Sequence, residues 1–403
     1  MAKRFLSLAL WGVVALAAAQ STAALAQQAP APGLPPEVVI GFVSLDDDPR
    51  FDRRLAHLEI LVRKWGPALE GADLGITDAI SIGREINVAF ALEGAVEPDV
   101  ATMIADVEDW TRDGIQFVIA DLPADLLLQL ADGLAGLPVT IFNVSAPEDS
   151  LRGTECRQNI IHMIPSNRML TDATLQYLVS RRWRNILVLQ GPSPEDAAVV
   201  AALRESAVNF QARIVDVRPF VPGNDPRNRD FSNVAVLTAG GNYDVVFVAD
   251  ADGEFAANVP YHTDDPRPVV GAAGLVPLAW HWAWDRQGAP QLNARFEYFY
   301  GRRMGSDDWA AWTAVRAVTQ AVLRTTSTEY ATLLAYILSD QLSLDGVKAA
   351  SMSVRPWDHQ LRQPVLLATG NAVVQRAPIE GFVHPTNNLD TLGVDAAQTA
   401  CRF

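Results

Sequence analysis

Short apolar runs alternate with segments of helical periodicity along most of this chain, and this alternation limits the possible folds more than any other feature. The first half contains strand-like runs at 38–44, 86–92, 115–120 and 139–144 and helical patterns at 53–65, 98–112 and 123–134. Continuous apolar runs between helices are typical of parallel strands that are covered on both faces. The first half is therefore predicted to form a doubly wound α/β unit.

A second run of the same kind follows residues 164–167. It has helical patterns at 168–181 and 194–210, a further helix or crossover at 231–238, and strand-like runs at 186–190, 212–217, 243–249 and 268–271. Helical patterns then dominate at 309–323 and 330–338, before strand-like segments return at 351–354 and 364–368. The late strands indicate that the chain returns to a lobe it has already built.

We therefore predict two Rossmann-like α/β lobes joined by a hinge of three crossings, near 164–167, 274–280 and 342–346. The first lobe is expected to comprise 37–164 and 277–343, and the second 165–276 and 344–385, followed by a tail at 386–403.

The first residues have the pattern of an export signal. Lys3 and Arg4 precede an apolar run at 5–19, and Ala24-Leu25-Ala26 fits a small-x-small cleavage site. The apolar run is short for a membrane-spanning helix. We expect residues 1–26 to be removed and the mature protein to be soluble in the periplasm.

The charge balance and the two cysteines limit the partners. The chain has 47 acidic and 32 basic residues, so nucleic acid and anionic lipid are poor partners and cations or a basic docking face are better ones. Cys156 and Cys401 lack nearby Cys or His at metal-ligand spacing. In an oxidising compartment we expect them to form one disulfide that ties the tail to the body.

Motifs of common enzyme classes are missing from the sequence. It contains no nucleophile elbow, phosphate loop, dinucleotide glycine fingerprint or His-Glu-x-x-His, and its six histidines are scattered. Trp280, Trp282 and Trp284 could stack on an aromatic ligand, but such residues more often fill an interface between lobes. We expect a protein that is not an enzyme.

Several sequence blocks carry a family resemblance. They are VVIGFVSL (38–45), VTIFNVSAPEDSLRG (139–153), IPSN (164–167), YDVVFVADADGEF (243–255) and LDGVKAASMSVRPWDHQLRQP (344–364). With the two lobes, they resemble type I, branched-chain-amino-acid-type, periplasmic substrate-binding proteins, and more narrowly the substrate-binding component of ABC transporters associated with PQQ-dependent alcohol dehydrogenase systems. The resemblance implies a monomeric binding protein that closes two lobes on a ligand and presents it to an inner-membrane permease. It also implies a setting of lanthanide-dependent methanol oxidation in methylotrophs.

The resemblance also implies where the ligand binds. Ligands of this fold lie between the lobes, at loops after the carboxyl ends of strands. The candidate ligand-binding residues are Ser44, Asp46, Asp47, Asp48, Asp121, Asn143, Ser145, Asp250, Asp252, Glu254 and Trp280. Amino-acid binders of the family use small hydroxyl residues in the second of these loops, where this chain has Asp121-Leu122-Pro123-Ala124. This departure argues against amino-acid binding.

The acids in these loops allow two interpretations. Asp46, Asp47, Asp121, Asp250, Asp252 and Glu254 could be the oxygen ligands of a lanthanide or calcium ion, since hard cations prefer several carboxylates. The alternative is that the acids cap helix N-termini. No cofactor is implied with certainty.

Three hypotheses for function follow. The first is a receptor that delivers a lanthanide ion or complex to an ABC transporter. The second is the same fold with a small organic ligand, such as an alcohol-oxidation product, a PQQ-like cofactor or an amino acid, in which case Trp280, Trp282, Arg84 and Ser145 would matter. The third is an interaction protein that assembles other periplasmic components.

Overall fold

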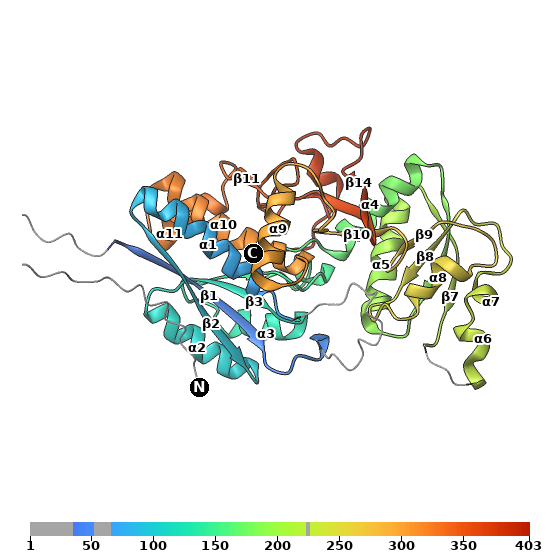
Figure 1. The fold of residues 1–403 in the computed structure, drawn as a ribbon, viewed down its shortest axis with the longest axis horizontal. Helices are drawn as coiled ribbons and strands as arrows, with labels where there is room; N and C mark the ends of the chain where they lie inside the picture. Colours follow the sequence, from blue (N-terminus) through green and yellow to red (C-terminus); the bar gives the residue numbers. More distant parts are fainter. Residues whose placement is uncertain (1–34, 52–65, 223–225) are drawn as a thin grey trace, which may run out of the picture.

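The chain folds into two α/β lobes that lie side by side (Figure 1). The computed structural model describes residues 35–51, 66–222 and 226–403. The predicted export signal at 1–26 and the helical pattern at 53–65 lie outside these ranges.

The first lobe is built on a five-stranded parallel sheet with the strand order β2-β1-β3-β4-β5. Its strands are β1 (Glu37–Leu45), β2 (Ala89–Glu97), β3 (Phe117–Asp121), β4 (Thr140–Asn143) and β5 (Ile160–His162). Its helices are α1 (Leu69–Ile86), α2 (Val100–Arg112), α3 (Ala124–Gly133), α9 (Ala289–Tyr300), α10 (Ser306–Thr325) and α11 (Tyr330–Ile337). Side chains of β1 alternate between two cores, with Ile40 and Phe42 in one and Val43 in the other. This sheet is therefore buried on both faces, as predicted.

Helix α1 was not predicted, and because of it the second strand begins later in the sequence than expected. The expected strand at 86–92 begins only at Ala89, because residues 69–86 are helical. A side chain on Gly71 would place its Cβ 2.1 Å from the backbone oxygen of Asp308, and one on Gly75 would come within 2.8 Å of Val315. These glycines allow α1 to pack closely against α10, although glycine in a sequence usually argues against a helix.

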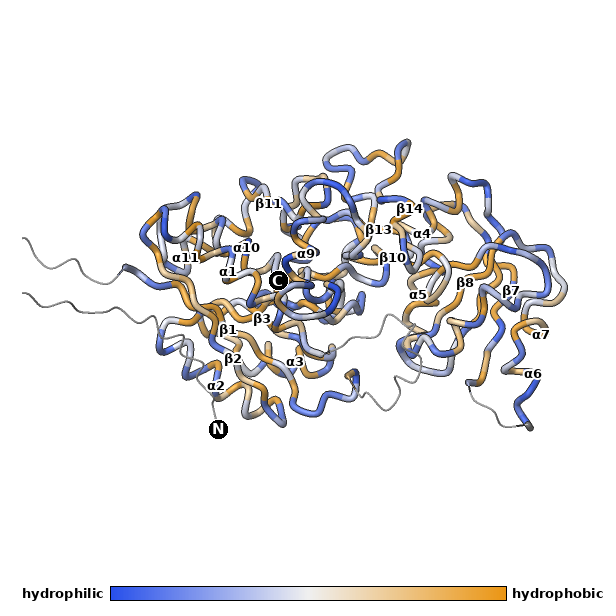
Figure 2. The backbone as a smooth tube through the Cα atoms, viewed as in Figure 1, coloured by the Kyte–Doolittle hydropathy of each residue, from blue (hydrophilic) through white to orange (hydrophobic). Residues whose placement is uncertain are grey.

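The second lobe is built on a four-stranded parallel sheet with the order β7-β6-β8-β9. Its strands are β6 (Asn185–Gln190), β7 (Arg213–Pro219), β8 (Val245–Ala249) and β9 (Val269–Gly271). Its helices are α4 (Asn167–Ser180), α5 (Pro194–Asn209), α6 (Arg229–Ser232), α7 (Val234–Thr238) and α8 (Val259–His262). Figure 2 shows apolar residues along the strands of both sheets and polar residues in many of the loops.

Two small antiparallel sheets lie outside the main ones. The first contains β10 (Val276–Leu278), β13 (Val365–Thr369) and β14 (Ala372–Ala377), and the second contains β11 (Leu344–Asp345) and β12 (Ser351–Met352). Leu344, Met352 and Leu361 belong to the core of the first lobe, whereas Val365 and Leu367 belong to the core of the second. Strand β13 therefore lies between the two cores, since Leu366 belongs to the core of the first lobe and its neighbours Val365 and Leu367 belong to that of the second.

Buried polar side chains tie the three crossings together. Lys348 is fully buried, and its Nζ donates hydrogen bonds of 2.9 Å each to the Ala279 oxygen, the Gln363 Oε1 and the Pro364 oxygen. Gln363 Nε2 donates to the Met163 oxygen at 2.7 Å. Burial holds the pKa of Lys348 well below its usual value. One polar cluster thus fixes the geometry of the hinge.

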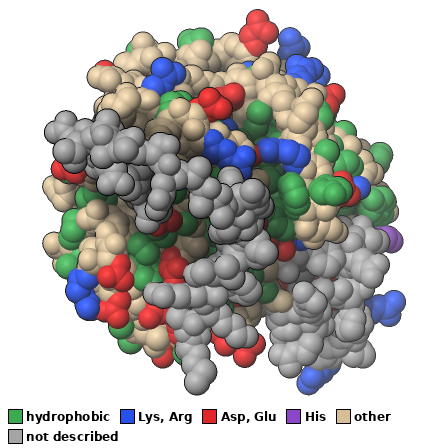
Figure 3. Space-filling view, turned by 60° about the vertical axis from the view of Figure 1, so that its left-hand side comes forward, with side chains coloured by type: hydrophobic (Ala, Val, Ile, Leu, Met, Phe, Trp, Pro, Cys, Tyr) green, Lys and Arg blue, Asp and Glu red, His purple; other side chains and the backbone are tan. Residues whose placement is uncertain are grey.

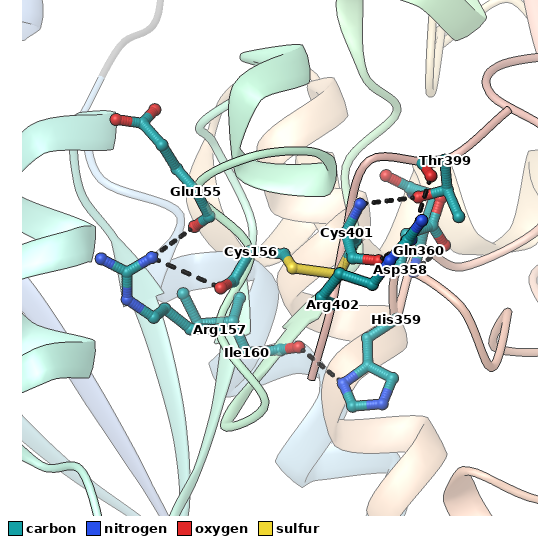
Figure 4. The surroundings of a disulfide bond; sticks show 10 residues. All are labelled: Glu155, Cys156, Arg157, Ile160, Asp358, His359, Gln360, Thr399, Cys401 and Arg402. Atoms are coloured by element: carbon teal, nitrogen blue, oxygen red, sulfur yellow. Dashed lines mark hydrogen bonds between the residues drawn. A yellow bond between two sulfur atoms is a disulfide. The ribbon is translucent and has the colours of Figure 1, made fainter.

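The C-terminal segment makes a fourth connection between the lobes. Leu392 packs in the core of the second lobe, and the Gly393 N–H donates to Asp172 of α4 at 2.8 Å. The chain then returns to the first lobe, where Cys401 forms the expected disulfide with Cys156 (Figure 4). Phe403 stacks on His359 with ring centroids 4.2 Å apart.

The surface is uneven in charge. On the face in Figure 3, Asp and Glu side chains gather in the lower part, and a group of Lys and Arg side chains lies above the centre. Among the described residues, no helix is both long and apolar enough to cross a membrane.

Candidate functional site

Arg50 is the centre of a polar cluster that joins three loops of the first lobe. It lies in a short 3-10 helix, Pro49–Phe51, after β1. Its Nη2 donates to Asp48 Oδ2 at 2.6 Å and to Asp121 Oδ1 at 3.0 Å, and its Nη1 donates to Ser145 Oγ at 3.1 Å. The three acceptors follow or end β1, β3 and β4, so one guanidinium connects the carboxyl ends of three neighbouring strands.

The two carboxylates of this cluster are buried. The side chain of Asp48 is 1% exposed and that of Asp121 is 0% exposed, against 22% for Arg50. Asp121 Oδ2 also accepts from the Ala68 N–H at the start of α1, at 2.8 Å. Burial lowers the pKa of Arg50, but Asp121 and Asp48 outweigh it and raise that pKa above its ordinary value. Arg50 thus contributes positive charge to two buried carboxylates, which lowers the cost of their burial.

The three consecutive acids have different environments. Asp48 points inward to Arg50, whereas Asp46 and Asp47 are exposed. Asp47 has φ of 50°, a left-handed conformation that Asp tolerates better than most residues. The turn at Asp47 therefore separates one internal carboxylate from two solvated ones.

Asn143 and Ser145 shape the loop after β4. Asn143 is fully buried, its Oδ1 accepts from the Ala146 N–H at 2.9 Å, and its Nδ2 lies 3.0 Å from His162 Nδ1. Ser145 Oγ donates to the Leu122 oxygen at 3.2 Å. Asn143 is thus a structural residue of the turn, while Ser145 belongs to the Arg50 cluster.

Among the predicted ligand-binding residues, Ser44 has a buried side-chain oxygen without a hydrogen-bond partner in the described part of the chain. Ser44 is paired in register with Asp121 on the neighbouring parallel strand, so the two side chains emerge on the same face of the sheet.

The acidic loop of the second lobe is a capping structure. Asp250 Oδ2 accepts from the Ala256 N–H at 2.8 Å, at the start of the 3-10 helix Ala256–Asn258. Asp196, which is 3% exposed and completes a capping box on α5, accepts from the Ala251 N–H at 2.6 Å. Burial raises the pKa of Asp250. Asp252 and Glu254 are exposed at the surface of this loop.

The six carboxylates predicted as cation ligands are not gathered at one point. Asp121 faces Arg50 and the start of α1, Asp250 caps a helix, and the others lie exposed on two different loops. Within the described ranges, no three His, Cys, Asp or Glu side chains are grouped as a metal site requires. For Asp121 and Asp250, the structure has the geometry of the alternative interpretation, in which the acids cap helices.

The tryptophans and Arg84 lie away from this cluster. Trp280 is 1% exposed, donates through Nε1 to Asn293 Oδ1 at 3.0 Å, and stacks on Trp309. Trp282 lines a separate small cavity of about 210 Å³ and is covered by the Arg303 guanidinium. Arg84 lies in the last turn of α1, whereas the cluster contacts the first turn of that helix. Trp280 therefore has a structural role.

Sequence reasoning missed Arg50. The available signal was its position two residues after an acid at the carboxyl end of a predicted strand, but a lone arginine in a loop is usually a solvated charge.

The chain has the fold of type I periplasmic binding proteins. No protein-family model matches it, and no curated protein matches it in sequence. Among solved structures, it is similar to the closed form of a leucine-, isoleucine-, valine-, threonine- and alanine-binding protein from Brucella ovis, with a TM-score of 0.69, 14% identity, and 91% of this chain and 98% of that chain covered.

Two further structures carry ligands. An ABC transporter substrate-binding protein from Desulfitobacterium hafniense, in complex with Leu, matches with a TM-score of 0.65 and 15% identity over 84% of this chain and 99% of that chain. A solute-binding protein of an ABC transporter from Rhodopseudomonas palustris, in complex with 3,4-dihydroxybenzoic acid, matches with a TM-score of 0.60 and 11% identity over 83% and 93%. At these identities, the similarity establishes the fold alone.

Proposed function

We propose that this protein is the periplasmic receptor of an ABC transporter, and that it closes its two lobes on a small organic molecule and delivers it to a membrane permease. The two-lobed fold supports this proposal, as do the solved relatives, which are substrate-binding proteins. The loops at the carboxyl ends of the strands in both lobes are the expected ligand site of such a fold.

The charge of these loops supports a ligand with a positively charged group. In the described part of the chain, the residues that end or follow β1, β3, β4, β6, β8 and β9 (46–51, 121–123, 144–153, 191–193, 250–255 and 272–275) carry nine acids, at 46, 47, 48, 121, 148, 149, 250, 252 and 254, and two basic residues, Arg50 and Arg152. Arg50 is already paired with two of these acids. The excess negative charge raises the local concentration of cations. Small amines, including amino acids through their ammonium group, are therefore the preferred ligand class.

A multivalent metal ion is the second candidate. The exposed carboxylates of Asp46, Asp47 and Glu254 favour it, because a lanthanide or calcium ion prefers several carboxylate oxygens. It would require the two lobes to bring these loops together. The link to PQQ-dependent alcohol oxidation rests on the sequence resemblance alone.

Calorimetric titration of the mature protein tests the proposal. The panel contains amino acids, mono- and diamines, 3,4-dihydroxybenzoate, PQQ, lanthanum and calcium. We expect an amine or amino acid to bind, and Glu254→Gln to weaken it about two- to fivefold, as for loss of one exposed charge. The control Glu108→Gln, on exposed helix α2, should leave the affinity unchanged. Binding of lanthanum alone, or of uncharged and anionic compounds alone, would contradict the proposed ligand class.

A further inference from the structure

We propose that Arg50 is a tethered occupant of the first-lobe half of the ligand site, and that a cationic group of the ligand takes its place. This inference rests on the proposed function and deepens it. The guanidinium lies against the carboxyl ends of β1, β3 and β4, where a ligand of this fold is expected to bind.

The residues that line this half-site, Asp48, Asp121 and Ser145, are more firmly held than the Arg50 side chain that fills it. The carboxylates of Asp48 and Asp121 are buried, while the Arg50 side chain is 22% exposed and thus has a path to solvent. Each lining residue also has a bond that does not involve the guanidinium. Asp48 Oδ1 accepts from the backbone N–H of Arg50 at 2.8 Å, a bond that remains when only the side chain moves. Asp121 accepts from the Ala68 N–H, and Ser145 donates to the Leu122 oxygen. The half-site would therefore keep its form if the side chain left.

Ser44 provides a second, independent observation. Its buried Oγ lies beside Asp121 in the sheet register and is not satisfied by Arg50 or by the rest of the described chain. Native proteins rarely leave a buried hydroxyl unpaired. A ligand with more hydrogen-bonding groups than the Arg50 guanidinium could form a hydrogen bond with the Ser44 hydroxyl.

Only a cation can replace Arg50 at low cost. Removal of the guanidinium alone would take the counter-charge from the buried carboxylate of Asp48 and one ion-pair partner from Asp121, which is strongly unfavourable. An incoming ammonium or guanidinium restores that charge. Because a tethered side chain competes at an effective concentration of about millimolar, Arg50 would lower the affinity for a cationic ligand. Such competition selects for cations and against neutral molecules.

The test uses methylguanidinium, which mimics the end of the Arg50 side chain. We expect Arg50→Ala to bind it saturably, and wild-type protein to bind it at least about tenfold more weakly, as when the free site is populated less than a tenth of the time. Arg50→Ala with Ser145→Ala should bind it less tightly than Arg50→Ala alone. Arg84→Ala is the matched control, because it removes an arginine of α1 outside the cluster.

The outcomes separate this inference from the proposed function. Equal affinity of wild-type protein and Arg50→Ala for methylguanidinium, or an equal gain in Arg84→Ala, would overturn the inference. If Arg50→Ala does not fold, Arg50→Lys keeps the charge without the fork and should still bind methylguanidinium more tightly than wild type. Arg50→Ala could bind methylguanidinium tightly while wild-type protein binds no amine of the panel. This result would refute the proposed ligand class but would still support a cation site beneath Arg50. If Arg50→Ala binds an amine more weakly than wild-type protein does, Arg50 contacts the ligand directly. That result would contradict the proposal that the Arg50 side chain competes with the ligand.

Discussion

At the scale of single residues, the structure distinguishes carboxylates that look equivalent in the sequence. Asp46, Asp47 and Asp48 are adjacent, but only Asp48 is buried, because the left-handed turn at Asp47 directs the chain back toward the sheet. Asp121 is the counterpart of Asp48 on the neighbouring loop. Asp48 and Asp121 thus share Arg50 as an ion-pair partner, whereas Asp46 and Asp47 are exposed.

This distinction predicts a large difference between two conservative changes. Asp121→Asn removes the charge that faces Arg50 and weakens the acceptor of the Ala68 N–H. We expect the free energy of unfolding to fall by about 3 kcal/mol or more, as when one partner of a buried ion pair is lost. Asp47→Asn is the control, since Asn is also tolerated at positive φ and the side chain is exposed. Urea unfolding of both variants measures the difference, and equal stability would show that Asp121 is not held by this ion pair.

At the scale of helices and strands, the sequence predicts regular elements well and irregular ones poorly. Strands such as β6 and β8 were predicted to within two residues, because their apolar runs are continuous. Helix α1 was missed because its glycines are needed for contact with α10, a requirement that only the tertiary structure shows. The Arg50 cluster was likewise out of reach, since it depends on three loops from distant parts of the sequence.

The C-terminal segment is an element whose anchoring can be tested directly. Its disulfide to Cys156 closes a long loop, which restricts the unfolded chain. We expect the double variant Cys156→Ser, Cys401→Ser to lose about 2–4 kcal/mol of unfolding free energy. Thermal unfolding with and without reductant provides the internal control: reductant should lower the melting temperature of wild-type protein and not that of the variant. An unchanged melting temperature in both would mean that the tail is held by its packing alone.

In the whole molecule, a polar hinge joins the two lobes. The hinge contains a buried lysine that is held by backbone and amide oxygens, and a tail that returns from the second lobe to the first. Such a hinge allows the lobes to move as rigid bodies about a few residues. Under the proposed function, a bound cation that pairs with the acidic loops of both lobes would favour the closed state.

Closure of the two lobes on a cationic ligand can be measured by small-angle X-ray scattering of the wild-type protein, recorded with and without the amine that binds most tightly. We expect the radius of gyration to decrease when the protein is saturated with the amine, and to stay unchanged with an alcohol of the same size and shape. A saturated complex with the same radius of gyration as the empty protein, or equal compaction by the uncharged alcohol, would contradict such closure.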